Sequence, residues 1–286
     1  MKVIVGKNAG FCYGVENAVN GAHKSLEQYK KIYCLGEIVH NKDVVSELEK
    51  KGLETVENIE QVKERTIIRA HGIPKQTYEK AKELNIELVD LTCPSVLRIH
   101  KIIEQYNEKG FFIFFIGVHN HPETIGSMSY GEENCALIQT EEEIENAINN
   151  LKKSNLKNLL IIAQTTFSLE NFKKLSEKIS KILEGTAINI EIINSVCNAT
   201  KIRQEETEEL SRNADCMIII GGKNSSNTKK LYEIACNNCE NVFLIENSKE
   251  LQIDQIQKFE TIAIMAGAST PQKSIEQVRL RANGNQ

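Results

Sequence analysis

Short apolar runs that each end in glycine or a polar side chain recur along this chain, and they constrain its fold more than any other feature. The clearest of them read IYCLGEIVH, TIIRAHG, FFIFFIGVHNHPE, NLLIIAQTT, CMIIIGGKNSSN and TIAIMAGAS. Continuous apolar runs of this kind are typical of strands that are buried on both faces of a parallel sheet. Because parallel strands need crossover connections, usually helices, the pattern predicts an α/β protein.

The polar tails of these runs predict where ligands bind. In open α/β sheets the binding crevice lies outside the carboxyl ends of the strands, which is where the tails fall. The four prolines of the chain, Pro74, Pro94, Pro122 and Pro271, also lie in these strand-end loops. There the fixed φ of proline shapes a turn or starts a helix without removing a hydrogen bond from the sheet.

Three cysteines share one position relative to predicted strands. The segments VIVGKNAGFC, IELVDLTC and IEIINSVC end at Cys12, Cys93 and Cys197, and a plausible helix follows each of them. Dividing the chain by this series predicts three α/β domains over residues 1–93, 94–193 and 194–286, each of ordinary domain size. No Gly/Ser-rich or Pro-rich linker separates these domains, so we expect them to pack against a shared centre.

Composition and hydropathy exclude several classes of protein. Hydrophobic residues make up 41% and charged residues 26% of the chain, which excludes collagen-like and disordered classes. The net charge of −4 provides no general basic field for nucleic acid. The longest apolar run, residues 111–118, is far shorter than the roughly 18 residues that a membrane helix needs. The N-terminus lacks a signal-peptide core, which predicts a cytoplasmic protein with reduced cysteines.

The three recurring cysteines predict a metal centre. Thiols near helix N-termini ionise more easily than isolated thiols. Their spacing matches no local zinc motif, but one thiolate from each domain can hold three irons of a [4Fe–4S] cluster and leave the fourth iron open to a substrate. Each cysteine taken alone is better explained as a small buried apolar residue, and it is the threefold recurrence that favours the metal.

The remaining five cysteines carry weaker signals. Cys34, Cys135 and Cys216 lie in or next to apolar runs, where packing is the expected role. Cys236 and Cys239 form a C-x-x-C pair at a predicted helix end, without the second pair that a zinc site needs. We assign no metal or redox role to this pair.

Histidines and hydroxyl-bearing residues close several of the predicted strands. Together they form a hydrogen-bonding shell, neutral to cationic, that suits a phosphate or diphosphate. The predicted shell comprises His40, His71, His121, Thr165, Thr166, Ser225, Ser226, Asn227 and Ser269. The motifs G-x-x-x-x-G-K-[ST] and G-x-G-x-x-G are absent from the sequence, so binding of nucleoside triphosphates and nicotinamide cofactors is unsupported.

Glu123 follows His121 and Pro122 at the end of the most apolar run. A carboxyl group beside apolar walls and a metal can have a raised proton affinity and act as a proton donor. The alternative is an ordinary acidic residue at a helix start, as we predict for the glutamates of QTEEEIENAINNL. We favour the proton donor.

Nine motifs, in their order and spacing, resemble those of the 4-hydroxy-3-methylbut-2-enyl diphosphate reductase family. They read GFCYGVENA, GEIVHN, RAHGIP, LTCPSV, HPET, AQTTFS, SVCNAT, GGKNSSNT and AGAST, and they span residues 10–271. The resemblance implies a trefoil of three α/β domains around one central, oxygen-sensitive [4Fe–4S] cluster held by Cys12, Cys93 and Cys197. It also implies reductive removal of an allylic hydroxyl to give isopentenyl and dimethylallyl diphosphate, the last step of the methylerythritol phosphate isoprenoid pathway.

The resemblance further implies roles for the strand-end residues. The diphosphate would be held by His40, His71, His121, Ser225, Ser226, Asn227 and Ser269. Thr165 and Glu123 would act at the hydroxyl end of the substrate, and ferredoxin or flavodoxin would deliver the electrons. We therefore predict an iron–sulfur oxidoreductase with neither a nucleic-acid nor a membrane partner. Two alternatives stay open, namely a cluster-dependent hydro-lyase and a non-enzymatic zinc protein or iron–sulfur sensor.

Overall fold

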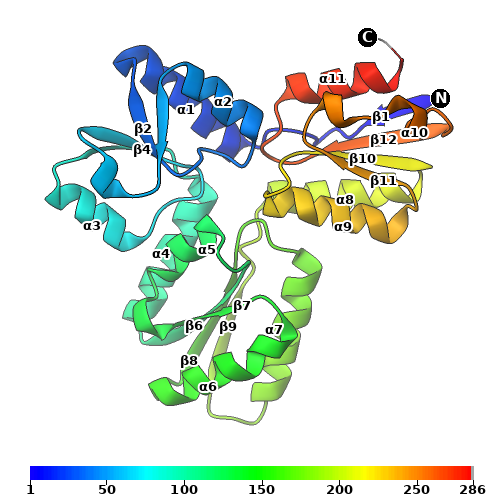
Figure 1. The fold of residues 1–286 in the computed structure, drawn as a ribbon. Coiled ribbons are helices and arrows are strands. Elements are labelled where there is room, and N and C mark those ends of the chain that lie inside the picture. Colours follow the sequence, from blue (N-terminus) through cyan, green and yellow to red (C-terminus); the bar gives the residue numbers. More distant parts are fainter. Residues whose placement is uncertain (285–286) are drawn as a thin grey trace. The chain divides into compact units, whose positions relative to one another are not determined.

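The computed structural model describes residues 1–284 and contains three four-stranded sheets in which every strand pair is parallel, which confirms the α/β class (Figure 1). The chain divides into two compact units. The first unit comprises residues 1–20, 39–51 and 198 onward, and the second comprises residues 21–38 and 52–197. The predicted division at residues 93 and 193 stays a prediction.

The sheet of the first unit has the strand order β1-β12-β10-β11. Its strands are β1 (Lys2–Val5), β10 (Cys216–Ile220), β11 (Val242–Ile245) and β12 (Thr261–Ala266). The helices of this unit are α2 (Lys42–Lys50), α8 (Asn198–Arg212), α9 (Ser226–Asn238), α10 (Ile253–Ile256) and α11 (Gln272–Ala282), with the 3₁₀ turn η4 (Ser248–Glu250). In Figure 1, α8 and α9 lie on one face of this sheet and α11 on the other.

The second unit contains two sheets with the orders β3-β2-β4-β5 and β7-β6-β8-β9. The strands of the earlier sheet are β2 (Ile32–Leu35), β3 (Leu53–Val56), β4 (Arg65–Ile68) and β5 (Glu87–Asp90). The strands of the later sheet are β6 (Phe111–Ile116), β7 (Cys135–Ile138), β8 (Asn158–Ala163) and β9 (Asn189–Ile193).

The helices that accompany these two sheets are α3 (Lys75–Glu83), α4 (Pro94–Glu108), α5 (Pro122–Met128), α6 (Ile144–Ser154) and α7 (Leu169–Leu183), with the 3₁₀ turns η1 (Ile59–Gln61), η2 (Glu132–Asn134) and η3 (Glu141–Glu143). Most of these helices connect parallel strands of one sheet, whereas α4 joins β5 of the earlier sheet to β6 of the later one. Helix α1 (Tyr13–Tyr29) begins in the first unit and ends in the second.

Strand β6 shows why its apolar run is continuous. Phe112, Phe114 and Ile116 pack in a core with residues of α6 and α7. The alternate residues, among them Ile113 and Phe115, pack in a second core with residues of α4. Because successive side chains of a strand point to opposite faces, a sheet covered by helices on both faces needs apolar residues at every position. The run FFIFFI satisfies this requirement.

Strands β3, β7 and β11 are absent from the sequence prediction, and each lies at an edge of its sheet. In β3 (LETV) polar residues interrupt the apolar pattern, whereas β7 (CALI) and β11 (VFLI) are short, partly buried apolar runs that the sequence analysis did not single out. The N-terminal strand is placed by pairing that the sequence does not reveal, because Lys2 lies beside Thr261 in β12. Long-range pairing of this kind leaves no periodic signal in either segment.

The predicted helix starts agree with the structure. Pro94 and Pro122 are the first residues of α4 and α5, and Pro74 and Pro271 immediately precede α3 and α11. Proline suits these positions because its missing N–H would have no partner in the first helical turn. The strand-end loops therefore turn directly into helices.

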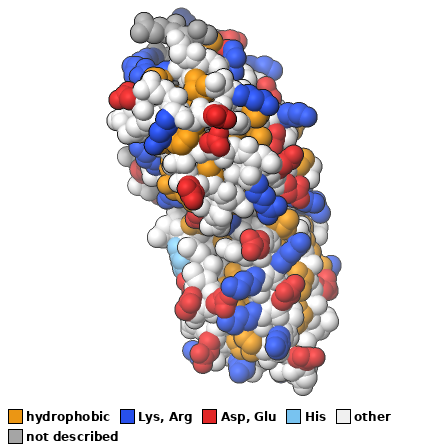
Figure 2. Space-filling view, turned by 90° about the vertical axis from the view of Figure 1, so that its right-hand side faces the viewer, with side chains coloured by type: hydrophobic (Ala, Val, Ile, Leu, Met, Phe, Trp, Pro, Cys, Tyr) orange, Lys and Arg blue, Asp and Glu red, His pale blue; other side chains and the backbone are white. Residues whose placement is uncertain are grey.

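The surface is mixed in charge. In the face drawn in Figure 2, lysine and arginine side chains are interspersed with aspartate and glutamate. This distribution agrees with the net charge of −4 and with a locally built anion site rather than a broad basic field. Within residues 1–284, no helix has the length and apolar character needed to cross a membrane.

Candidate active site

Each of the three recurring cysteines immediately precedes a helix. Cys12, Cys93 and Cys197 stand directly before the first residues of α1, α4 and α8. All three are half-buried thiols. The N-terminal end of a helix stabilises negative charge, which favours the thiolate form that binds iron. The predicted position of these cysteines is therefore confirmed, and their role as ligands stays a prediction.

Two of the other cysteines have a different environment. Cys34 and Cys216 lie inside β2 and β10 and are fully buried. Burial raises the pKa of both thiols to about 12, so they stay protonated at neutral pH. Because iron binds thiolates, Cys34 and Cys216 are poor candidates for ligands of an iron–sulfur cluster. The half-buried thiols at the helix starts are better candidates. The residues present fit such a cofactor.

The Cys12 loop is fixed by hydrogen bonds within the first unit. The backbone N–H of Cys12 donates to the carbonyl oxygen of Ala268 at 3.2 Å. Buried Arg203 of α8 donates to the carbonyl oxygen of Gly10 at 2.7 Å. Glu206, on the same helix, accepts the backbone N–H groups of Lys7 and Asn8. These bonds hold the loop that carries the cysteine in one conformation.

The Cys93 and Cys197 loops are each fixed to a strand-end loop of the second unit. The backbone N–H of Cys93 donates to the carbonyl oxygen of Ala70, the neighbour of His71, at 3.0 Å. The backbone N–H of Cys197 donates to the carbonyl oxygen of Thr165 at 3.0 Å. Each of these cysteines is thereby positioned by the loop that carries a predicted substrate-binding residue.

Glu123 is a buried acid with two hydrogen bonds from one residue. Its side chain is 1% exposed. The backbone N–H of Thr165 donates to Oε1 at 2.6 Å, and the hydroxyl of Thr165 donates to Oε2 at 2.7 Å. Burial raises the pKa of Glu123 to about 7, and the two bonds from Thr165 oppose this shift. The carboxyl group can therefore both hold and release a proton near neutral pH.

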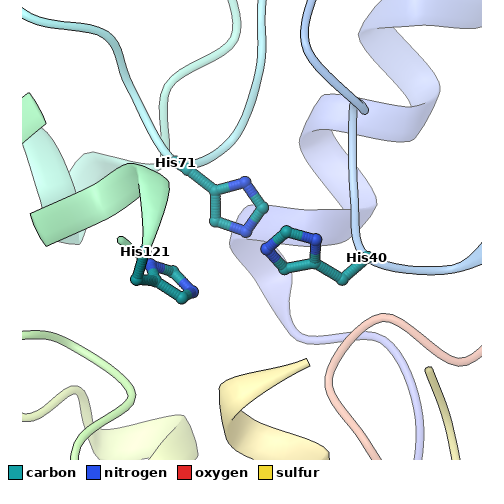
Figure 3. A group of neighbouring side chains, drawn as sticks. All are labelled: His40, His71 and His121. Atoms are coloured by element: carbon teal, nitrogen blue, oxygen red, sulfur yellow. The ribbon is translucent and has the colours of Figure 1, made fainter. Parts of the chain in front are cut away.

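His121 directly precedes α5, the helix that contains Glu123, and its ring is hydrogen-bonded to the backbone of this helix. Its Nδ1 accepts the backbone N–H of Glu123 at 3.1 Å, so the proton of the neutral ring lies on Nε2. The rings of His71 and His121 lie edge to face with their centroids 5.4 Å apart. Figure 3 shows these two side chains, together with His40, which belongs to the first unit. Two of the three predicted imidazoles are thus neighbours within one unit.

Gln164 is a site residue that the sequence analysis did not single out. It is fully buried, and its Oε1 accepts the backbone N–H of Val118 at 2.9 Å. Its Nε2 donates to the hydroxyl of Thr166 at 2.9 Å. Gln164 therefore ties the strand-end loop of β8 to that of β6, which carries His121. A polar residue directly before the two threonines of AQTT was the available sequence signal.

In the first unit, the predicted diphosphate residues gather at the carboxyl ends of β10 and β12. Ser225 caps α9, and its hydroxyl accepts the backbone N–H of Thr228 at 3.3 Å. The hydroxyl of Ser269 donates to the carbonyl oxygen of His40 at 3.1 Å. Ser226 is the first residue of α9. The structure thus links the His40 loop to the loop that follows β12.

The buried amide of Asn227 fits an anion-binding role in this unit. The residue is 3% exposed, and neither polar atom of its amide has a hydrogen-bond partner within the part of the chain that the structure describes. A buried amide without partners is costly, and a bound phosphate oxygen would accept its N–H. The residue therefore fits an anion site at the start of α9.

The C-x-x-C pair has its own local environment. Cys236 is exposed, whereas Cys239 is buried and its thiol lies 3.5 Å from the carbonyl oxygens of Ala214 and Asn241. These weak bonds give Cys239 a packing role at the end of α9. The absence of a metal role for this pair stays a prediction.

Comparison with known proteins identifies relatives over nearly the whole chain. The model of the LytB protein family matches residues 3–282. A protein from Clostridioides difficile named 4-hydroxy-3-methylbut-2-enyl diphosphate reductase is 41% identical over 281 residues, which cover 97% of this chain and 98% of the relative. A reductase of the same name from Caldanaerobacter subterraneus is 38% identical over 284 residues, covering 97% of this chain and 95% of the relative.

Two solved structures are similar to this chain. One is (E)-4-hydroxy-3-methyl-but-2-enyl diphosphate reductase, described as the terminal enzyme of the non-mevalonate pathway; it has 37% identity and a TM-score of 0.70, with 99% of this chain and 100% of that chain covered. The other is the E-1-hydroxy-2-methyl-but-2-enyl-4-diphosphate reductase from Plasmodium falciparum. It has 28% identity and a TM-score of 0.86, with 96% of this chain and 86% of that chain covered.

Proposed function

The chain belongs to the LytB protein family, and we propose that it reduces 4-hydroxy-3-methylbut-2-enyl diphosphate to isopentenyl and dimethylallyl diphosphate. The observation that best supports this chemistry is the connection from Glu123 through Thr165 to Cys197. It joins a buried acid with a pKa near 7 to a loop that carries a predicted cluster ligand. In this arrangement the proton donor, Glu123, would lie close to the cluster that delivers the electrons.

The reaction balances as a reductive dehydroxylation. The allylic C–O bond breaks, a C–H bond forms, and the hydroxyl group leaves as water. This change consumes two electrons and two protons for each substrate. The enzyme must therefore bind the diphosphate, orient the hydroxyl end and hold a proton beside it.

Members of this family use a metal–sulfur cofactor, and we propose one [4Fe–4S] cluster held by Cys12, Cys93 and Cys197. Each of the predicted domains, residues 1–93, 94–193 and 194–286, would contribute one of these cysteines. When bound, such a cluster supplies electrons to the C–O bond one at a time. Ferredoxin or flavodoxin would provide them, and a reducing compartment such as the cytoplasm would keep the thiols available.

Glu123 would hold the proton that the leaving hydroxyl takes up. At pH values below about 7 its carboxyl is mostly protonated, and the hydroxyl of Thr165 lies within hydrogen-bond distance of it. Proton transfer from the carboxyl, directly or through Thr165, would convert the hydroxyl into water. The buried position of Glu123 limits exchange of this proton with bulk solvent.

The diphosphate would be held by hydroxyl, amide and imidazole groups. In the first unit these are His40, Ser225, Ser226, Asn227 and Ser269, and in the second unit His71 and His121. The N-terminal turn of α9 adds backbone N–H groups and a favourable dipole for an anion.

The activity is tested with protein that has been purified without oxygen and analysed for iron and sulfide. We expect substrate-dependent oxidation of a reduced viologen, with two viologen cations consumed for each molecule of product. Both diphosphate products should appear. Loss of water from the substrate without viologen oxidation would instead identify a hydro-lyase and contradict the proposed reductase.

Replacement of Asn227 by alanine should weaken substrate binding while the cluster is retained. Losing one hydrogen bond to a charged group costs about 1.5–3 kcal/mol, or roughly ten- to more than a hundredfold in Kd. Anaerobic calorimetry with substrate, and with inorganic diphosphate as a competitor, measures this change. Asn238→Ala, at the opposite end of α9, is the matched control and should leave Kd unchanged. Equal affinities of the Asn227→Ala variant and the unmodified protein would exclude Asn227 from the diphosphate site.

A further inference from the structure

A cavity of about 460 Å³ lies at the carboxyl ends of β2 and β4 in the second unit. Gly36 and Arg69, the residues that directly follow these two strands, both line it. In the order β3-β2-β4-β5, the connection from β2 leads to one side and the connection from β4 leads to the other. This reversal is the topological switch point at which open α/β sheets bind ligands. None of the residues assigned to the diphosphate lines this cavity.

Arg69 is the unusual side chain of the cavity. It forms no hydrogen bond and no ion pair with any residue in the described range 1–284, and its Nε is buried without a partner. Burial lowers the pKa of Arg69 below its ordinary value. Arg69 as a whole is partly buried, and a buried guanidinium N–H without an acceptor is unfavourable. A bound oxyanion would remove this penalty.

Gly36 makes the space in which the guanidinium lies. A Cβ atom at this position would stand 2.1 Å from Nη1 of Arg69, and Gly36 has a φ of +69°, which other residues rarely adopt. Every residue with a side chain would therefore displace the guanidinium. The end of β2 therefore needs glycine at position 36 to leave room for the side chain of Arg69.

The other charged residues of the cavity form no ion pair with Arg69, although the negative charges of Glu57 and Glu37 act on it at longer range. Lys80 forms an ion pair with Glu83 at 2.9 Å. Glu57 and Glu60 also line the cavity, and Glu57 acts on Arg69 only at a distance. The two acids disfavour a polyanion, whereas one oxyanion group can pair with Arg69 in two parallel hydrogen bonds. The hydroxyl of Thr77 and the amide of Gln76 line the same cavity and offer further donors.

We propose that this cavity binds a small molecule through a single phosphate or carboxylate group, held by Arg69. The volume lies within the range of about 300–1,000 Å³ that is usual for small-molecule sites. The site is additional to the active site and uses a different set of residues. Phosphate esters and carboxylates both present a pair of acceptor oxygens with the spacing that the two parallel N–H groups of a guanidinium recognise.

The test compares thermal unfolding of the holoenzyme with and without added anion, at constant ionic strength and without oxygen. Inorganic phosphate and malonate serve as separate probes. We expect at least one of them to raise Tm by about 2–4 °C at ten times its Kd. Arg69→Met retains most of the apolar stem but removes the charge. This variant should be at least as stable as the unmodified protein without anion, and it should not respond to the probe.

Two control variants separate this site from other effects. Arg65→Met removes a charge from the opposite end of β4, where Arg65 is paired with Glu87 at 2.8 Å, and it should keep the response. Asn227→Ala should also keep it, which distinguishes this cavity from the proposed diphosphate site. The proposal is overturned if neither probe stabilises the unmodified protein, or if Arg69→Met responds equally. If Arg69→Met does not fold, Arg69→Lys replaces it and should show at least a tenfold weaker Kd for the probe.

Discussion

Replacement of Cys93 or Cys197 by serine is expected to abolish the activity and to leave the purified protein without its iron and sulfide. Both residues directly precede a helix, and each is hydrogen-bonded through its backbone to a strand-end loop of the second unit. Serine preserves these backbone bonds but binds iron poorly, because its hydroxyl does not ionise near neutral pH. Iron and sulfide analysis, with the visible absorption of the anaerobic protein, measures the loss. Cys12→Ser should behave in the same way.

Cys236→Ser is the matched control for these variants. Its thiol is exposed at the end of α9, so the same chemical change should leave the iron content and the turnover unchanged. If Cys236→Ser loses iron while Cys93→Ser keeps it, the ligand assignment is wrong. Circular dichroism of all four variants shows whether the fold persists.

Glu123→Gln should bind substrate and keep the cluster, yet lose turnover by about 10²–10⁴-fold, the usual contribution of one positioned proton donor. Glutamine has nearly the same shape as glutamate, but it has no carboxylic proton to give. Steady-state kcat at saturating electron donor measures the loss, and calorimetry measures substrate affinity. A kcat near that of the unmodified enzyme, with chemistry shown to be rate-limiting, would falsify the proton-donor role and direct attention to His121.

The pH dependence of kcat provides a second measurement on Glu123. Burial raises the pKa of its carboxyl to about 7, so the protonated form predominates below this pH and disappears above it. Turnover that depends on the protonated carboxyl must therefore fall as pH rises through about 7. In Glu123→Gln this decline should be absent from the residual activity, because no titrating carboxyl remains. Retention of the same decline would assign it to another group.

Much of the fold could be predicted from the sequence because buried parallel strands consist of continuous runs of apolar residues. Strands such as β6, β8 and β10 are covered on both faces, so their apolar runs are continuous. The edge strands are harder to find: β3 (LETV) contains polar residues, and β7 (CALI) and β11 (VFLI) are apolar runs of only four residues. The pairing of β1 with β12 joins the two ends of the chain and depends on the folded context alone.

For the candidate site, the identity of several residues could be predicted from the sequence, whereas their contacts could not. Glu123, the histidines and the cysteines could be found because they end apolar runs at equivalent positions. Their hydrogen bonds could not, since the contact between Glu123 and Thr165 joins residues 42 positions apart. Gln164 and Arg69 also follow strands directly, but glutamine and arginine are common at such surface positions. Only burial, which depends on packing, distinguishes them.

Thr165 has a further consequence for how the enzyme behaves before its cofactor is inserted. Three of its groups are engaged at once: the N–H and the hydroxyl with Glu123, and the carbonyl oxygen with the N–H of Cys197. A displacement of the cysteine loop therefore pulls on the same residue that supplies both donors to the acid. Under the proposed assignment of Cys197 as a cofactor ligand, inserting the cofactor and setting the pKa of Glu123 both depend on Thr165, so we expect this pKa to differ between the protein without its cofactor and the complete enzyme.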